Sequence, residues 1–131
     1  MAILVDTSAW FARFVADDPE HARVAKWFAE NDKPLITTDY CIDEVLTLLI
    51  ARKRPLLAVE AGRLLFDESV AQLHFLTAEP IQRSWIVFQQ RAAAGWSFTD
   101  CTSKTAIEQL KITEAVTLDR HFEQFGVTIL P

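Results

Sequence analysis

Short apolar runs alternate with amphipathic segments along the whole chain, and this alternation constrains the fold more than any other feature of the sequence. The first run, Ala2–Val5, is continuously apolar and partly β-branched, which is typical of a strand buried in a parallel sheet. Trp10, Phe11 and Phe14 follow it at helical spacing. Strands that alternate with helices predict an α/β fold, in which helices cover both faces of a mainly parallel sheet.

Residues that begin and end helices mark the expected elements. Thr38 and Asp39 cap a long helix, which ends where the cations of Arg52–Arg54 precede Pro55. Gly95 closes a helix that begins at Pro80. We therefore expect strands at 2–5, 35–37, 73–76, 115–117 and 127–130. We expect helices that begin at Thr7, Pro19 and Asp39, and further helices at 56–66, 80–94 and 97–110.

The size and composition predict one globular domain over residues 1–131. Half of the residues are hydrophobic and 24% are charged, which is ordinary for a globular protein. No apolar run approaches the ~20 residues that span a bilayer, and the first run is too short for a signal peptide. We therefore expect a soluble cytoplasmic protein without a membrane segment. The net charge of −5 argues against a plain DNA-binding module but permits a nuclease whose bound cations reverse the local charge.

Four carboxylates stand where the predicted topology brings them together. Asp6 follows the first strand and Asp119 the fourth, and sites in parallel sheets gather at the carboxyl ends of the strands. Glu44 and Asp100 lie near the starts of two predicted helices. Each acid alone has a structural explanation, as a helix cap, a capping-box partner of Ser97 or a solvated helix residue. Together, four acids at one edge would repel one another strongly without a cation between them.

Such a cluster suits the hydrolysis of phosphodiester bonds. Mg²⁺ and Mn²⁺ prefer oxygen ligands, and one or two such ions can clamp a phosphate, generate hydroxide and stabilise the leaving oxygen. Lys104 shares a helix face with Asp100; a surface ion pair with Asp100 or Glu108 is the simpler interpretation, and a phosphate contact is the alternative. The hydroxyl side chains placed beside the acids to orient a ligand or water are those of Thr7, Ser8, Thr99 and Ser103.

Several other classes of site lack the residues they need. The three histidines show no zinc-like i, i+4 spacing, and Cys41 and Cys101 form neither a metal-ligand pattern nor a redox motif. The three glycines are isolated, so no glycine-rich phosphate loop is present. A phosphatase of the haloacid-dehalogenase type needs a second acid where this chain has Ser8, and a receiver domain needs paired acids near the first strand.

Four segments resemble the PIN-domain ribonucleases, and among them the VapC-type toxins of type II toxin–antitoxin systems. The segments are Ile3–Trp10, Ile42–Leu46, Ser97–Ser103 and Thr117–Val127, in matching order and spacing. The resemblance spans nearly the whole chain and implies a three-layer α/β/α sandwich with a mainly parallel five-stranded sheet. It also implies an endoribonuclease dependent on Mg²⁺ or Mn²⁺. The residues that it implies as metal ligands and catalytic acids are Asp6, Glu44, Asp100 and Asp119.

The resemblance decides between Asp43 and Glu44, which the apolar periodicity leaves equivalent. The acid of the family at this position is usually a glutamate followed by a hydrophobic residue, and here Val45 follows Glu44. Lys104 departs from the family, in which a hydrophobic residue is common at this position.

The resemblance also implies partners: an RNA substrate, a cognate antitoxin protein and a second copy in a homodimer. A catalytically idle PIN-like protein that acts by binding a partner or RNA is the alternative function, and the intact set of four acids argues against it. Five aromatic residues of the first two helices either form an exposed apolar groove or all belong to the core. These residues are Trp10, Phe11, Phe14, Trp27 and Phe28. Basic residues that are candidates for RNA phosphate contacts are Arg13, Arg52, Lys53, Arg54, Arg91 and Arg120.

Overall fold

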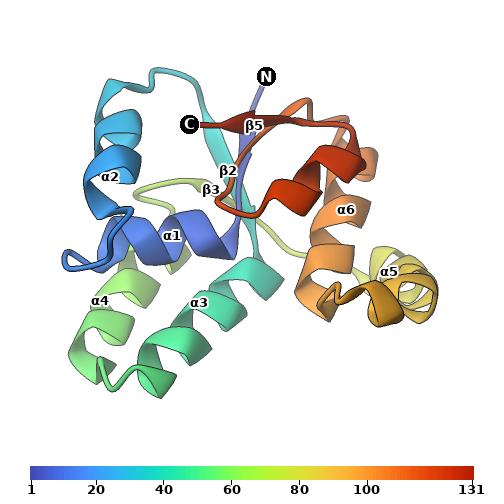
Figure 1. Ribbon diagram of the computed structural model, residues 1–131, viewed down its shortest axis with the longest axis horizontal. Coiled ribbons are helices and arrows are strands. Elements are labelled where there is room, and N and C mark those ends of the chain that lie inside the picture. Colours follow the sequence, from blue (N-terminus) through green and yellow to red (C-terminus); the bar gives the residue numbers. More distant parts are fainter.

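A five-stranded sheet forms the centre of the computed structural model, which describes all residues from 1 to 131 (Figure 1). The strands lie in the order β3-β2-β1-β4-β5, and all four neighbouring pairs are parallel. The predicted α/β class and the parallel five-stranded sheet are confirmed. The strands are β1 (Ile3–Val5), β2 (Leu35–Thr38), β3 (Gln72–His74), β4 (Glu114–Val116) and β5 (Thr128–Leu130).

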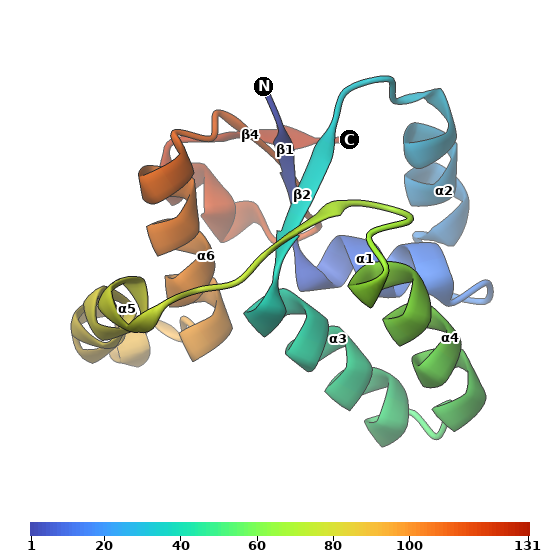
Figure 2. The ribbon, with the colours of Figure 1, turned by 180° about the vertical axis from the view of Figure 1, so that it is seen from behind.

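Helices cover both faces of the sheet and give the predicted three-layer arrangement. Helices α1 to α4 lie on one side, and α5, α6 and the 3-10 helix η2 lie on the other (Figures 1 and 2). None of the helices is both long and apolar enough to cross a membrane. The first four are α1 (Thr7–Phe14), α2 (His21–Glu30), α3 (Asp39–Ala51) and α4 (Pro55–Phe66). The others are α5 (Ala78–Arg91), η1 (Ala92–Ala94), α6 (Phe98–Leu110) and η2 (Arg120–Phe125).

The central strand β1 places its side chains alternately in two hydrophobic cores. Ile3 and Val5 belong to the core formed with α1, α3 and α4, whereas Leu4 belongs to the core formed with α6 and η2. All three residues are buried. Burial on both faces explains why this strand is continuously apolar instead of alternating between apolar and polar residues.

The predicted start of the second helix is wrong by two residues. The helix α2 begins at His21, not at Pro19. The amide of Glu20 donates to the carboxylate of Asp18 (2.9 Å), so the chain first makes a turn closed by this side chain.

The segment from β3 to α5 also differs from the predicted boundaries. The strand β3 ends at His74, and the chain then leaves the sheet, where the amide of Leu76 donates to the carboxylate of Asp39 (3.1 Å). The helix α5 begins at Ala78, which places Pro80 in its first turn. Proline is tolerated there because amides of the first turn have no partner inside the helix. The remaining predicted boundaries agree closely with the structure.

The five aromatic residues of α1 and α2 pack together, with Trp10 and Phe11 inside the core and three others half-buried at its edge, namely Phe14, Trp27 and Phe28. Trp10 is fully buried and Phe11 is nearly so. Trp10 stacks on the rings of Phe14 (5.7 Å) and Phe28 (5.4 Å), and Trp27 packs edge-on against Phe28. These contacts fill the space between α1, α2 and the sheet.

Replacing Leu49 with Ala is expected to lower the free energy of unfolding by about 2–5 kcal/mol, because the vacated volume lies in a packed core. Leu49 of α3 is fully buried in the core beneath α1 and α4. Urea unfolding followed by circular dichroism measures the effect. The control is Leu56→Ala on α4, where the side chain is 86% exposed, and equal losses in the two variants would contradict this packing.

Candidate functional site

The candidate site lies at the carboxyl ends of the neighbouring strands β1 and β4. The chain continues from β1 to β2 on one side, and β4 adds on the other side, which makes this the switch point of the sheet. Asp6 follows β1, and its amide donates to the carbonyl of Val116 at the end of β4 (3.0 Å). Asp119 follows β4 and caps η2. Two acids that are far apart in the sequence thus meet at one edge.

Asp6 is a buried carboxylate held by hydroxyl groups. Its Oδ2 accepts hydrogen bonds from Thr117 Oγ1 (2.9 Å) and Ser8 Oγ (3.1 Å), and the residue is only 5% exposed. Burial is the main cause that raises the pKa of Asp6 from 3.8 to about 6; the charge of Asp100 also raises it, and the hydrogen bonds oppose the rise. The site therefore holds two carboxylates close enough to disfavour each other's charge.

Thr117 joins Asp6 to Asp119. Its hydroxyl donates to Asp6 and accepts a hydrogen bond from the amide of Asp119 (3.0 Å). Ser8 Oγ lies 3.2 Å from Thr117 Oγ1 and accepts a hydrogen bond from the amide of Leu118 (2.9 Å). These bonds fix the turn after β4 against the start of α1, so the two acids keep a constant relation.

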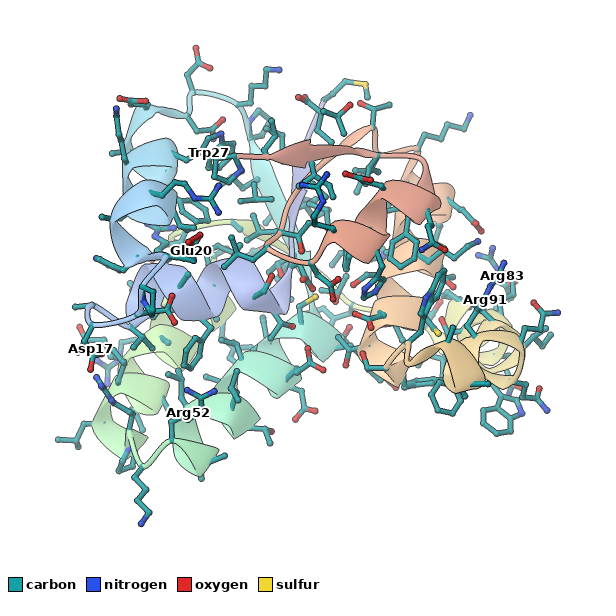
Figure 3. All side chains as sticks on the ribbon, in the orientation of Figure 1. Asp17, Glu20, Trp27, Arg52, Arg83 and Arg91 are labelled. Atoms are coloured by element: carbon teal, nitrogen blue, oxygen red, sulfur yellow. The ribbon has the colours of Figure 1, made fainter.

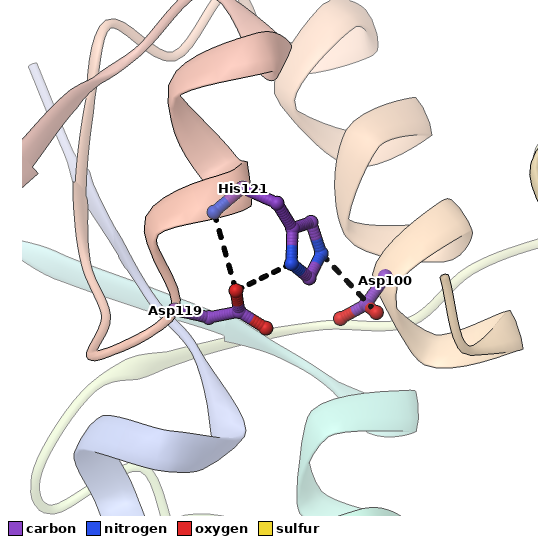
Figure 4. A group of neighbouring side chains, drawn as sticks. All are labelled: Asp100, Asp119 and His121. Atoms are coloured by element: carbon purple, nitrogen blue, oxygen red, sulfur yellow. Dashed lines mark hydrogen bonds and ion pairs between the residues drawn. The ribbon is translucent and has the colours of Figure 1, made fainter. Parts of the chain in front are cut away.

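Asp100 enters the site from the first turn of α6, where it forms the expected capping box with Ser97. Its Oδ2 accepts from the amide of Ser97 (2.8 Å), and Ser97 Oγ accepts from the amide of Asp100 (3.0 Å). His121 lies between Asp100 and Asp119 (Figure 4): Nδ1 contacts Asp119 Oδ1, and Nε2 lies 3.2 Å from Asp100 Oδ2. One ligand atom from each of these three residues lies within 4.8 Å of the others. The structural role of Asp100 and its place in the cluster therefore coexist.

Glu44 is half-buried on α3, while its neighbour Asp43 is exposed. Glu44 is therefore the less exposed of the two neighbouring acids. One turn earlier, Cys41 is fully buried, and its Sγ lies 3.6 Å from Ser103 Oγ of α6. No hydrogen bond or ion pair joins Glu44 to the other three acids. Thr117 and His121 link three of the four predicted acids, and Glu44 lies on the adjoining helix.

The predicted supporting hydroxyls have different surroundings. Ser8 contacts Asp6 directly. Thr7 Oγ1 is buried beside Asp6 without a hydrogen-bond partner. Ser103 faces a thiol of α3 and none of the acids, and Thr99 is half-buried next to Asp100 in the sequence. Of these four residues, Ser8 has the clearest role in orienting an acid.

Two other polar groups near α6 are engaged or inert. Lys104 pairs with Glu108 one helical turn later, as the simpler interpretation predicted. Cys41 and Cys101 are buried, free thiols. Burial is the main cause that raises the pKa of both, to about 11 for Cys41, so neither thiol is ionised near neutral pH.

Most of the basic residues predicted to contact RNA are engaged within the protein. Arg13 is half-buried over the ring of Phe28 (4.4 Å), and burial lowers its pKa. Arg54 pairs with Asp17 (2.8 Å), and Arg120 pairs with an acid three positions later (2.7 Å). Surface ion pairs contribute little free energy, so Arg54 and Arg120 can exchange their partners for a phosphate, whereas Arg13 is packed against the ring.

Arg91 is the basic candidate whose contacts lead to the acids. Its guanidinium lies 5.3 Å from the ring centre of Trp96, and Trp96 in turn stacks on His121 (5.5 Å). Arg52 lies instead over an aromatic ring of α1 (5.2 Å), and Figure 3 shows it on the opposite side of the molecule from Arg91. Lys53 adjoins Arg52 at the exposed turn after α3. Arg91 therefore reaches the site through Trp96, and Arg120 adjoins the site in the chain between Asp119 and His121.

The donors of the site suit a divalent cation. Oxygen ligands of negative charge are what hard divalent ions prefer, and Asp6, Asp100 and Asp119 provide them within one linked network. A cation there would offset both the burial of the Asp6 carboxylate and its repulsion with Asp100.

A model of the PIN domain matches residues 3–127, which is nearly the entire chain. The chain belongs to the PIN-domain family. The 23S rRNA-specific endonuclease VapC20 of Mycobacterium tuberculosis is 27% identical over 124 residues, which cover 95% of this chain and 94% of that protein. A VapC ribonuclease of Archaeoglobus fulgidus is 30% identical over 133 residues, which cover 93% of this chain and 80% of that protein. Both relatives place the chain among the VapC-type members.

A solved PIN structure supports the same assignment through the similarity of its three-dimensional fold. The crystal structure of Mycobacterium tuberculosis VapC20, described as a sarcin–ricin loop cleaving toxin, matches with a TM-score of 0.89. The two sequences are 26% identical, and the match covers 97% of each chain. The order of strands and helices is therefore that of a VapC-type PIN domain throughout.

Two side chains that organise this PIN site, Thr117 and His121, were not among the predicted site residues. The signal in the sequence is their nearness to Asp119, because Thr117 lies two residues before it and His121 two residues after it. Zinc-like spacing between histidines does not detect a single histidine that pairs with acids.

Replacing Thr117 with Val is expected to lower the free energy of unfolding of the PIN domain by about 1–3 kcal/mol, because it leaves buried partners unsatisfied. The variant removes the donor to Asp6 and the acceptor for the amide of Asp119. Urea unfolding of the metal-free protein measures the loss. Thr117→Ser keeps the hydroxyl and serves as the control; a Val variant as stable as the Ser variant would refute the role of these two bonds.

Proposed function

We propose that this chain is a metal-dependent endoribonuclease and the toxin of a type II toxin–antitoxin pair. The linked set of Asp6, Asp100 and Asp119 at the switch point of a parallel sheet carries the proposal. The VapC relatives that match along nearly the whole chain are named as an endonuclease and a ribonuclease. The chain hydrolyses phosphodiester bonds of RNA as one PIN-like nuclease domain over residues 1–131.

Four acids hold the metal in this proposal, and the ion is Mg²⁺ or Mn²⁺. When bound, such an ion would neutralise charge on the phosphate and lower the pKa of a water, which makes hydroxide available as the nucleophile near neutral pH. The protein's own side chains supply the positioning: Thr117 and Ser8 orient one acid, and the capping box fixes another. Thr7 and Thr99 are proposed to orient bound ligands, and Ser103 acts by holding α6 against α3. The proposed metal ligands and catalytic acids are Asp6, Glu44, Asp100 and Asp119.

The substrate proposed first is ribosomal RNA, because the Mycobacterium tuberculosis relative is named as specific for 23S rRNA. The net charge of −5 makes the protein as a whole unattractive to a phosphate backbone. Binding therefore depends on the metal site and on local cations, of which Arg91 is the one whose contacts lead to the acids. An enzyme of this kind acts in the cytoplasm, where its substrate is.

A cognate antitoxin and a second copy of the chain are the proposed protein partners. Both follow from membership of the VapC type, in which a small antitoxin holds the nuclease inactive. Co-expression with a candidate antitoxin and light scattering of the purified complex test both partners.

Cleavage of total cellular RNA by the purified protein tests the function. Discrete fragments are expected with Mg²⁺ or Mn²⁺, and none after EDTA is added. Primer extension across 23S rRNA then maps the cut to one or a few positions if ribosomal RNA is the substrate. The control is the heat-denatured protein from the same preparation, which excludes a contaminating nuclease that survives heating.

The catalytically idle alternative predicts a different pattern. An idle protein binds RNA or its partner but yields no fragments with any metal, including when the RNA is supplied as intact ribosomes. That result would overturn the proposed function, because the acids would then serve no reaction. Fragments that persist in EDTA would overturn its metal dependence.

A further inference from the structure

The imidazole of His121 lies between two acids of the proposed site. Nδ1 contacts Oδ1 of Asp119, and the same oxygen accepts a hydrogen bond from the backbone amide of His121 (3.2 Å). Nε2 lies 3.2 Å from Oδ2 of Asp100, but it is buried and makes no aligned hydrogen bond (Figure 4). The two nitrogens therefore have different surroundings. Nδ1 is held by Asp119, whereas Nε2 lies near Asp100 but is not hydrogen-bonded to it.

Aromatic contacts hold the ring in this position. Trp96 stacks on His121 with ring centres 5.5 Å apart and planes 24° apart, and Phe125 packs against His121 edge-on. Trp96 is itself buried, and its ring also contacts the guanidinium of Arg91. The ring of His121 cannot turn away from the acids without losing this stack, so its two nitrogens keep their directions.

The contact with Asp119 decides which nitrogen is free to bind a cation. A carboxylate oxygen only accepts hydrogen bonds, so Nδ1 carries the hydrogen toward Asp119. In a neutral ring the lone pair is then on Nε2, which faces Asp100. Histidines that bind metals commonly have this arrangement, in which a carboxylate holds one nitrogen and the other nitrogen meets the ion.

We propose that His121 is a nitrogen ligand of the metal ion, which it binds through Nε2 together with Asp100, while Asp119 orients the ring. This inference rests on the proposed function of the site. Ligand atoms of the three residues lie within 4.8 Å of one another. An ion on Nε2 lies on the far side of the ring from Asp119, so Asp100 shares this ion with His121, and Asp119 acts on it through the ring.

A nitrogen ligand changes which ions the site prefers. Mg²⁺ is a hard ion that prefers oxygen, whereas imidazole binds readily to transition-metal ions. Removing the imidazole is therefore expected to lower the affinity for Mn²⁺ by about tenfold and the affinity for Mg²⁺ by less. Isothermal titration calorimetry of His121→Phe measures both affinities, and this variant keeps an aromatic ring to stack on Trp96.

Electron spin-echo modulation of the Mn²⁺-loaded wild-type protein tests the bond directly. A nitrogen bound to Mn²⁺ gives a ¹⁴N coupling, and growth with ¹⁵N-labelled histidine replaces it with the ¹⁵N pattern. We expect this coupling in the wild type, its loss in His121→Phe, and its retention in His21→Gln. His21 is the matched control, because its Nδ1 contacts the carbonyl of Ala12 on α1 and not an acid of the site.

The outcomes separate this inference from the proposed function. Mn²⁺ bound without any histidine coupling, together with intact RNA cleavage, would show that His121 is only an ion-pair partner of the acids. That result would overturn the inference and leave the function standing. A protein that neither binds Mn²⁺ nor cleaves RNA would overturn both.

Discussion

Replacing Asp100 with Asn lowers the rate of RNA cleavage by about a hundredfold or more, because a charged group that supports the reacting centre is lost. The substitution is nearly isosteric and keeps the capping box, since the amide oxygen of Asn still accepts the hydrogen bond from Ser97. The helix α6 therefore starts at the same place, and the fold is retained. Single-turnover cleavage with Mn²⁺ at saturating RNA measures the rate, and circular dichroism checks the fold.

The matched control for this experiment is Asp43→Asn. It removes the same charge from α3 next to Glu44, but the side chain of Asp43 is exposed and makes no hydrogen bond or ion pair with the acids of the site. We expect this variant to cleave at nearly the wild-type rate. If Asp43→Asn lost as much activity as Asp100→Asn, the effect would come from net charge, and the assignment of Asp100 would fall.

Replacing Asp6 with Asn stabilises the metal-free protein increasingly as the pH rises from about 4 to about 8. The pKa of Asp6 is raised from 3.8 to about 6, chiefly by burial, so folding favours the protonated form. The stability that this group contributes is full below pH 3.8 and is lost as the pH rises through about 6. Asn lacks this loss, so the difference in unfolding free energy between variant and wild type grows by about 3 kcal/mol over the range.

Urea unfolding at a series of pH values, with EDTA present, measures this difference. The control is Asp43→Asn, which removes an exposed carboxylate. We expect the difference in unfolding free energy between this variant and the wild type to stay constant with pH. When Mn²⁺ replaces EDTA, we expect the wild type to become more stable and the difference in unfolding free energy between Asp6→Asn and the wild type to become smaller. The reason is that a bound cation compensates the charge of Asp6. A difference in unfolding free energy that does not change with pH would mean that burial does not raise the pKa of Asp6.

The layers of the fold and the location of the site could be predicted because they depend on local patterns. The continuous apolar run at β1 reports burial on both faces, and the parallel sheet follows from it. The acids Asp6 and Asp119 follow strands directly, so the topology alone brings them to one edge. The capping box of Ser97 and Asp100 was visible in the sequence and is present in the structure.

The remaining features depend on contacts between distant parts of the chain, which local patterns do not contain. The 3-10 helix η2 forms where Asp119 caps it, in a segment that the sequence left unassigned. Among the five aromatic residues of α1 and α2, Trp10 lies in the core and Phe28, which stacks on it, is only half-buried, a difference that the sequence pattern does not contain. The place of His121 in the site depends on its stacking with Trp96, a contact between distant residues that the sequence does not show.

The most direct test of the account is cleavage of purified 23S rRNA by EDTA-stripped protein as Mn²⁺ is added back, with Asp100→Asn measured in parallel. We expect cleavage to rise over the same range of Mn²⁺ concentration in which calorimetry detects binding, and we expect the variant to stay inactive throughout. Cleavage by the stripped protein without added metal, or equal cleavage by the variant, would contradict the claim that these acids hold a metal used to cut RNA.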